Sequence, residues 1–138
     1  MTRQEILKWR QEAGGMNKLL GIQIIELDEG CATASLNLVP EVLNPLGMAH
    51  GGTIFTLCDV AAGTAAASRG RVAVTLSSSI DYYKPGKAGE TLIARATERK
   101  HGRTTNVYHV EVQDTQGTHV ADARFIMFYT GAMIEDLR

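Results

Sequence analysis

The chain has 138 residues, of which 44% are hydrophobic and 21% charged, and its formal net charge is −1. This length and composition fit one globular domain, assigned to residues 1–138, and exclude a general field that would attract nucleic acid or a membrane surface. No run of about 18 apolar residues occurs, so no membrane-spanning helix is expected.

The N-terminal residues predict a short amphipathic helix over residues 3–13. Thr2 and Glu5 form a T-x-x-E capping box, and Ile6 and Trp9 fall on one face of the helix that follows. The pair of glycines after residue 13 ends this helix. Its apolar stripe indicates a packing face or a lid.

The next segments favour two strands and a loop. Residues 20–28 are rich in strand-forming side chains, and residues 31–39 alternate small apolar and polar side chains with a period of two. Residues 40–48 contain two prolines and one glycine, which predicts a loop.

An unusually apolar helix is predicted from Thr53 to Ala67. Apolar or small residues surround nearly its whole circumference, which is typical of a helix buried on all sides. A narrow stripe of small or polar positions carries a single carboxylate, Asp59, and no basic residue lies within a helical turn of it. Because an unpaired buried carboxylate costs several kcal/mol, we expect Asp59 at a cleft or subunit interface, as nucleophile or general base. The alternative is an ordinary surface aspartate or one paired with a buried arginine.

The remainder of the chain reads as long strands separated by turns. The predicted strands are rich in β-branched and aromatic residues and cover 71–84, 90–100, 103–114 and 118–130. Short connections between them imply antiparallel hairpins, and long strands twist and curl. The sequence therefore predicts an α+β fold in which a curled antiparallel sheet wraps around one buried helix.

The start of the apolar helix is the second candidate for chemistry. His50, Gly51 and Gly52 precede it, and the unpaired N–H groups of a helix N-terminus carry partial positive charge. The N–H of Gly51 could hold a carbonyl and stabilise the oxyanion that develops on attack. Asn44 could support the loop or bind the ligand. The alternatives are an ordinary loop-to-helix junction and an Asx turn before Pro45.

Together these residues resemble a known family. The pattern of Asn44, the His50–Gly52 triplet and Asp59, followed by Ile80–Pro85 and Gly89-Glu90, is similar to the hotdog-fold acyl-CoA thioesterases. The nearest branch is the PaaI-like group of phenylacetate degradation, which includes the mammalian thioesterase superfamily member 2 type. The resemblance extends over residues 21–128.

The resemblance implies a fold, an assembly and an activity. It implies a long curved sheet around a central helix, and a homodimer joined sheet edge to sheet edge. That dimer is expected to pair again into a homotetramer. The active sites would lie at the dimer interface and would hydrolyse acyl-CoA to free acid and CoA.

The resemblance also implies residue roles. Asp59 would be the nucleophile or the base on water, and Gly51 would polarise the thioester carbonyl. Asn44 and His50 would orient the carbonyl and assist the leaving thiolate, and Thr75 would position water. Other branches place a threonine where this chain has Gly63.

A binding site for the CoA phosphates is expected among basic residues at strand ends and turns. Together with Gly52, the candidates are Lys84, Lys87, Arg99, Lys100 and Arg103. The alternative for each is an ordinary solvated turn. His101, His109 and His119 show no metal-ligand spacing and are interpreted as structural or surface residues.

The cysteines and the N-terminus indicate a cellular location. Cys31 and Cys58 form neither a metal motif nor a disulfide framework, and residues 1–15 lack the apolar core of a signal peptide. We therefore expect a cytoplasmic protein that needs no metal or cofactor, with acyl-CoA as its substrate.

Two other functions fit the same fold. An acyl-CoA hydratase or dehydratase would need an aspartate–histidine pair on a short loop-to-helix segment, whereas here His50 precedes Asp59 by nine residues. A non-catalytic acyl-CoA sensor would carry a DNA-binding domain in addition, and the intact carboxylate argues against binding alone.

Overall fold

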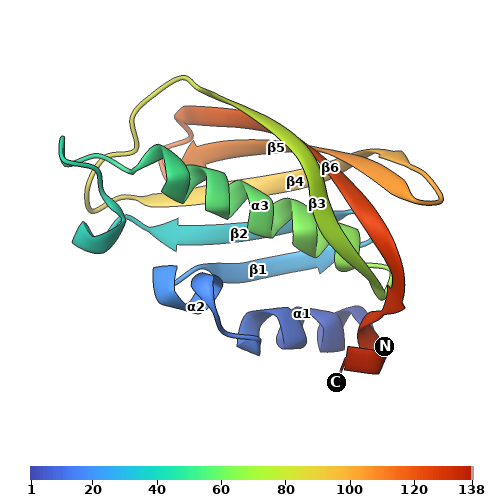
Figure 1. Ribbon diagram of the computed structural model, residues 1–138. Coiled ribbons are helices and arrows are strands. Elements are labelled where there is room, and N and C mark those ends of the chain that lie inside the picture. Colours follow the sequence, from blue (N-terminus) through green and yellow to red (C-terminus); the bar gives the residue numbers. More distant parts are fainter. Residues whose placement is uncertain (138) are drawn as a thin grey trace.

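A six-stranded antiparallel β-sheet wraps around one long helix in the computed structural model, which describes residues 1–137 (Figure 1). The strands, in chain order, are β1 (Gln23–Asp28), β2 (Cys31–Asn37), β3 (Arg71–Tyr82), β4 (Thr91–His101), β5 (Thr105–Asp114) and β6 (His119–Met133). The helices are α1 (Arg3–Glu12), α2 (Met16–Leu20) and α3 (Gly51–Ala67), with 3-10 turns at Pro40–Val42 and Ile134–Leu137. The strand order β1-β2-β4-β5-β6-β3 and the central α3 confirm the predicted α+β hotdog architecture.

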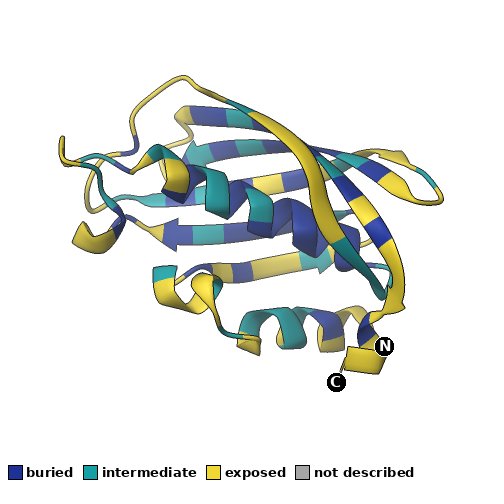
Figure 2. Ribbon diagram, in the orientation of Figure 1, coloured by how far each residue is buried: buried dark blue, intermediate teal, exposed yellow. Residues whose placement is uncertain are grey.

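Helix α3 is the centre of the hydrophobic core. Leu57, Ala61 and Ala65 have no exposed surface, and Figure 2 shows burial concentrated in the C-terminal half of α3 and in the strands behind it. Small alanine side chains let the sheet pack closely around the helix at the density of a protein interior. No helix within residues 1–137 is both long and apolar enough to cross a lipid bilayer.

The N-terminal region differs from prediction at one place. The capping box is confirmed, since Thr2 Oγ1 accepts the Glu5 N–H at 3.2 Å and α1 follows directly. However, the predicted strand from residue 20 is wrong in its first residues, because a short helix, α2, ends there. Gly21 adopts a left-handed φ of 74° and its N–H bonds to the Lys18 carbonyl, which closes the helix before β1 begins.

The sheet confirms two predicted hairpins and corrects a third. The β4–β5 and β5–β6 pairs are antiparallel neighbours, as expected. The prolyl-glycyl connection after β3 does not form a hairpin, because β3 pairs with β6 whereas β4 pairs with β2. Residues 83–90 instead cross beside the start of α3, where the Gly86 carbonyl accepts the Ala49 N–H at 2.8 Å. A Cβ at Gly86 would lie 2.9 Å from that of Ala49, so the crossing requires glycine.

Strand β3 is an edge strand with apolar side chains exposed. Val74 is 49% exposed and Leu76 60%, and Ser77 to Ser79 are exposed as well. An unpaired edge with exposed apolar residues is a ready surface for pairing with another strand.

An ion pair joins the end of α3 to the sheet. Glu98 on β4 accepts hydrogen bonds from both terminal nitrogens of Arg69, at 2.7 and 3.1 Å, and from the Tyr108 hydroxyl at 3.1 Å. Burial alone would raise the pKa of Glu98. The hydrogen bonds from Arg69 and Tyr108, together with the charges of Arg69 and His101, outweigh burial and lower the pKa below its ordinary value.

We expect the Glu98→Gln variant to lose about 1–3 kcal/mol of unfolding free energy at neutral pH, the range for a hydrogen-bonded charged group. Because the folded-state pKa is lowered, this stabilisation is complete above the ordinary pKa of about 4.3 and is lost as pH falls through the folded value. Urea unfolding at about pH 7 and pH 3.5 checks this, with the exposed Glu26→Gln on β1 as control. Equal deficits at both pH values would contradict the assignment.

Candidate active site

The first half of the site is the N-terminus of α3. His50 is the N-cap, and its Nδ1 accepts the Gly52 N–H at 2.9 Å. The Gly51 N–H, by contrast, has no acceptor within residues 1–137. The structure thus leaves the Gly51 N–H available to a ligand, while the Gly52 N–H, which we expected to take part in binding, is used by the cap.

His50 is left with one functional ring nitrogen. Because Nδ1 accepts a hydrogen bond, the neutral ring carries its proton on Nε2. The side chain is exposed, so Nε2 is free to donate to a group placed at the helix start. This orientation suits a residue that hydrogen-bonds a carbonyl or a leaving group.

Asn44 supports the loop that precedes α3. Its Oδ1 accepts the N–H groups of Leu46 and Met48, at 2.9 and 3.1 Å. The alternative of an Asx turn is therefore confirmed. The Asn44 side chain also lines a pocket of about 290 Å³ together with Gly51 and Lys84, so its amide NH₂ remains available there.

Tyr82 was not singled out from the sequence, yet it lines this pocket. Its hydroxyl donates to the Gly51 carbonyl at 2.7 Å and so holds the start of α3 against the end of β3. Burial, followed by the charge of Cys58, raises the pKa of Tyr82, which keeps the phenol protonated. A tyrosine in a predicted strand carries no signal of this contact, which depends on the crossing of residues 83–90.

The second half of the site is the carboxylate of Asp59. The side chain is half-buried, and Asp59 Oδ1 accepts a hydrogen bond from the Thr75 hydroxyl on β3 at 2.5 Å. The structure thus brings together two residues that the family resemblance paired only by role. The neighbouring Cys58 is not a competing nucleophile, because burial and the charges of Asp59 and Asp122 raise the pKa of its thiol to about 12.

Arg10 brings a positive charge that the sequence did not place near Asp59. Its Nε donates to Thr64 Oγ1 at 2.7 Å, and its Nη2 would lie 3.1 Å from a Cβ at Gly63. Gly63 is one helical turn beyond Asp59, so the absence of a side chain there makes room for the guanidinium. Burial lowers the pKa of Arg10 to about 10, and the charge of Asp59 opposes that shift. Helix α1 therefore supplies the basic neighbour that local sequence lacks.

The two halves of the site are separated along α3. Asp59 follows Gly51 by eight positions, which corresponds to about 12 Å of helix at 1.5 Å per residue. One thioester carbonyl would have difficulty contacting both groups of a single chain.

The basic residues also form two groups rather than one. Lys84 and Lys87 lie on the connection after β3, beside the start of α3. The others lie at the far end of the sheet, around the β4–β5 turn, and they are Arg99, Lys100 and Arg103. A single protomer therefore does not gather the five side chains that we expected to bind CoA phosphates.

The contact between Thr75 and Asp59 can be tested directly. We expect Thr75→Val to lower kcat about ten- to a hundredfold, because a hydrogen bond to a charged acceptor is worth about 1.5–3 kcal/mol. Thr75→Ser keeps the hydroxyl and should retain most of the activity. Steady-state kinetics of the two variants measure this difference. Equal kcat values in Thr75→Val and Thr75→Ser would contradict a role for the hydroxyl.

Comparison with known proteins places this geometry in a family. The family model described as the Thioesterase superfamily matches residues 46–121, which include Gly51, Asp59 and Thr75. The acyl-coenzyme A thioesterase PaaI of Escherichia coli K12 is 41% identical over 104 residues, covering 75% of this chain and 74% of that protein. The human acyl-coenzyme A thioesterase 13 is 27% identical over 125 residues, 88% of this chain and 89% of that protein.

Solved structures agree with the sequence comparison. The E. coli PaaI structure superposes with a TM-score of 0.91 at 35% identity, over 95% of each chain. A hypothetical thioesterase of Streptococcus pneumoniae TIGR4, solved with coenzyme A, gives a TM-score of 0.78 at 38% identity, over 81% of this chain and 90% of that one.

Two mutants of the S. pneumoniae protein bear on the same pair of residues. Their structures carry single alanine substitutions of an aspartate and of a threonine, at positions 16 residues apart. Asp59 and Thr75 have the same separation in this chain. With the family-model match, the identity to E. coli PaaI and the shared fold, the chain belongs to the Thioesterase superfamily.

Proposed function

We propose that the protein is an acyl-CoA thioesterase that hydrolyses the thioester bond to a free acid and CoA. The observation that carries the proposal is the half-buried Asp59 carboxylate, held by the Thr75 hydroxyl at 2.5 Å in a chain of this superfamily. Relatives named as acyl-CoA thioesterases and a relative solved with coenzyme A support the choice of substrate.

The proposed mechanism assigns a role to each half of the site. The Gly51 N–H and the positive end of α3 bind the carbonyl oxygen and stabilise the oxyanion. In one route Asp59 attacks the carbonyl carbon, the carbon–sulfur bond breaks to release the CoA thiolate, and water then hydrolyses the acyl–aspartyl anhydride to the free acid. In the other, Asp59 removes a proton from a water that attacks the carbonyl carbon, the carbon–sulfur bond breaks, and the CoA thiolate takes up a proton. In this mechanism His50 Nε2 donates a hydrogen bond to the departing thiolate, and Asn44 orients the carbonyl.

We further propose a homodimer that joins two β3 edges and pairs again into a homotetramer. An antiparallel β3–β3 pair would continue the sheet and bury Val74 and Leu76, which are exposed in one protomer. The Gly51 of one chain could then face the Asp59 of the other, which removes the difficulty of their separation along α3.

The same pairing gives a reason for the divided basic residues. Antiparallel strands place the end of one β3, next to Lys84, beside the beginning of the other. The beginning of β3 lies next to the β4–β5 turn, because Arg71 Nη2 donates to the Arg103 carbonyl at 3.0 Å. We propose that the two basic groups meet across the interface and bind the CoA phosphates as point charges.

Hydrolysis of a panel of acyl-CoA esters tests the function. Arylacetyl-, benzoyl-, medium-chain and long-chain acyl-CoA are each incubated with the protein, and released CoA is measured with a thiol reagent. We expect thiol release from at least one class. Water addition to an enoyl-CoA without thiol release would favour a hydratase, and tight acyl-CoA binding without turnover would favour a binding protein.

The cellular location is proposed as the cytoplasm. Cys31 and Cys58 are both free thiols, as cysteines generally are in reducing compartments.

A further inference from the structure

Three carboxylates stand in a row across three neighbouring strands. The sheet register places Asp81 of β3 directly opposite Asp122 of β6, and Asp122 directly opposite Glu111 of β5. Like charges that face each other across antiparallel strands repel and destabilise the sheet. A row of three is therefore a costly arrangement unless positive charge compensates it.

This row lies on the outer face of the sheet, away from α3. The flanking residues Val110, Val112, Ala121 and Ala123 are buried toward the helix, and side chains alternate between the two faces of a strand. No lysine or arginine within residues 1–137 lies within 4.0 Å of the three carboxylates. Arg95 of β4 stands directly opposite Glu111 at the end of the row, but it forms no ion pair within 4.0 Å, so Asp122 and Asp81 have no cationic side chain of lysine or arginine paired with them in the described residues.

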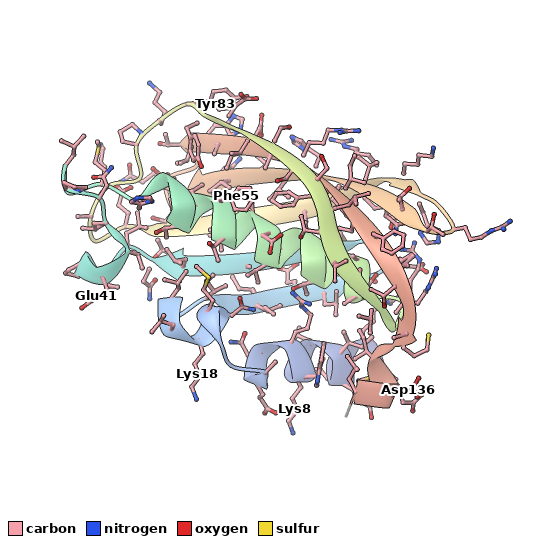
Figure 3. The ribbon with its side chains drawn as sticks, in the orientation of Figure 1. Lys8, Lys18, Glu41, Phe55, Tyr83 and Asp136 are labelled. Atoms are coloured by element: carbon pink, nitrogen blue, oxygen red, sulfur yellow. The ribbon has the colours of Figure 1, made fainter. Side chains whose placement is uncertain are left out.

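Two imidazoles converge on the central carboxylate instead. His119 Nε2 lies 2.8 Å from Asp122 Oδ1, and His109 Nε2 lies 3.4 Å from the same oxygen. Tyr83 holds this group in place, since its ring packs edge-on against His119 with centroids 5.1 Å apart and its hydroxyl donates to Asp122 Oδ2 at 3.3 Å. Figure 3 shows Tyr83 on the connection after β3, at the side of the molecule away from α1 and α2.

One ligand atom from each of Glu111, His119 and Asp122 lies within 4.8 Å of the other two. Imidazole nitrogen combined with carboxylate oxygen is a donor set that divalent transition metals, and zinc above all, prefer in proteins. We propose that Glu111, His119 and Asp122 form a binding site for a divalent transition-metal ion such as Zn²⁺, with a fourth position left to water or to His109 after its side chain moves.

The three ligand atoms lie within 4.8 Å of one another, and binding an ion would adjust these separations. Ligand atoms of a tetrahedral zinc site with bonds of 2.0–2.1 Å lie about 3.3 Å apart. The separation of His109 Nε2 from Asp122 Oδ1, 3.4 Å, already has this value. His119 Nε2 and Asp122 Oδ1 are closer because they share a hydrogen bond, and a metal ion would replace that proton and widen the gap by about half an ångström.

His109 stands outside the group of three, so as a fourth ligand its own side chain would have to move, and Arg99 would have to move with it. Arg99 Nη2 lies 3.4 Å from His109 Nδ1, and an imidazole that binds metal through Nε2 keeps its proton on Nδ1. Arg99 must therefore turn away from His109 when His109 binds the ion. The Tyr83 hydroxyl and Gln113, whose Nε2 donates to Glu111 Oε1 at 2.5 Å, orient the two carboxylates from outside the ligand set.

The test is a titration of the purified, chelator-treated full-length protein with Zn²⁺ by isothermal calorimetry. We expect one saturable site per chain in the wild type, and at least about tenfold weaker affinity in His119→Gln. His101→Gln is the matched control, because His101 lies on the neighbouring strand β4 and bonds to Asn106 instead of this cluster. It should bind Zn²⁺ like the wild type.

Thermal unfolding provides a second readout. Added Zn²⁺ should raise the melting temperature of the wild type and of His101→Gln, but not of His119→Gln or Asp122→Asn, because an ion that binds only the folded state stabilises it. If Asp122→Asn fails to fold, His119→Gln alone tests the site, because His119 is exposed and its replacement should not disturb the fold. Absence of saturable Zn²⁺ binding, or equal affinity in His119→Gln and the wild type, would overturn the proposal.

Discussion

Asp59→Asn is expected to reduce acyl-CoA turnover at least about a thousandfold while the fold and CoA binding persist. The amide has the size of the carboxylate, and its oxygen can still accept the Thr75 hydroxyl, so local packing is preserved. An amide is neither a nucleophile nor a base at neutral pH. A loss of that size corresponds to about 4 kcal/mol of activation free energy.

Thiol-release kinetics measure this effect, and calorimetry with free CoA shows that binding is retained. Asp136→Asn is a matched control, because Asp136 is exposed in the 3-10 turn at the C-terminal end of the chain, beyond the last residues of α3 (Figure 3). Undiminished hydrolysis in Asp59→Asn would reject Asp59 as the catalytic carboxylate.

Leu76→Lys is expected to produce a monomer that has lost nearly all activity. Leu76 is 60% exposed on the unpaired edge of β3, and two lysines brought together by β3–β3 pairing would repel and remain hydrated. Because Gly51 and Asp59 are about two helical turns apart, a monomer would lack half of each site. The residual rate should resemble that of Asp59→Asn.

Light scattering after size exclusion gives the oligomeric state, and hydrolysis is measured on the same fractions. Leu19→Lys makes the same substitution at another exposed leucine, 84% exposed in α2, and should leave both assembly and rate unchanged. A fully active Leu76→Lys monomer would contradict the shared site.

Local patterns in the sequence were sufficient to predict most of the fold. The all-round apolar character of residues 53–67 predicted burial, and Leu57 and Ala61 are fully enclosed. Turn residues predicted the β4–β5 and β5–β6 hairpins, because such pairs form between neighbours in the chain. The β3–β6 pairing was missed because it joins strands that are distant in sequence, and α2 was missed because five residues carry little helical periodicity.

The residues of the candidate site likewise fall into those that the sequence predicts and those that only the fold reveals. The sequence by itself determined that Asp59 lies in an apolar helix and that His50 and Gly51 begin it, since both facts follow from local spacing. Only the tertiary structure decided what surrounds them. The Thr75 hydroxyl, Arg10 and the Tyr82 hydroxyl reach the site from β3 and α1, through contacts that no local pattern encodes.

The cluster on the outer face of the sheet could not be predicted from the sequence either. From spacing alone, His109 and His119 carried no metal signal, and neither did Glu111 or Asp122. The register of β3, β5 and β6 sets the three carboxylates in one row and aims both imidazoles at the middle one. Strand register is decided by burial of the opposite face against α3, so this cluster exists only once the sheet has closed around its helix.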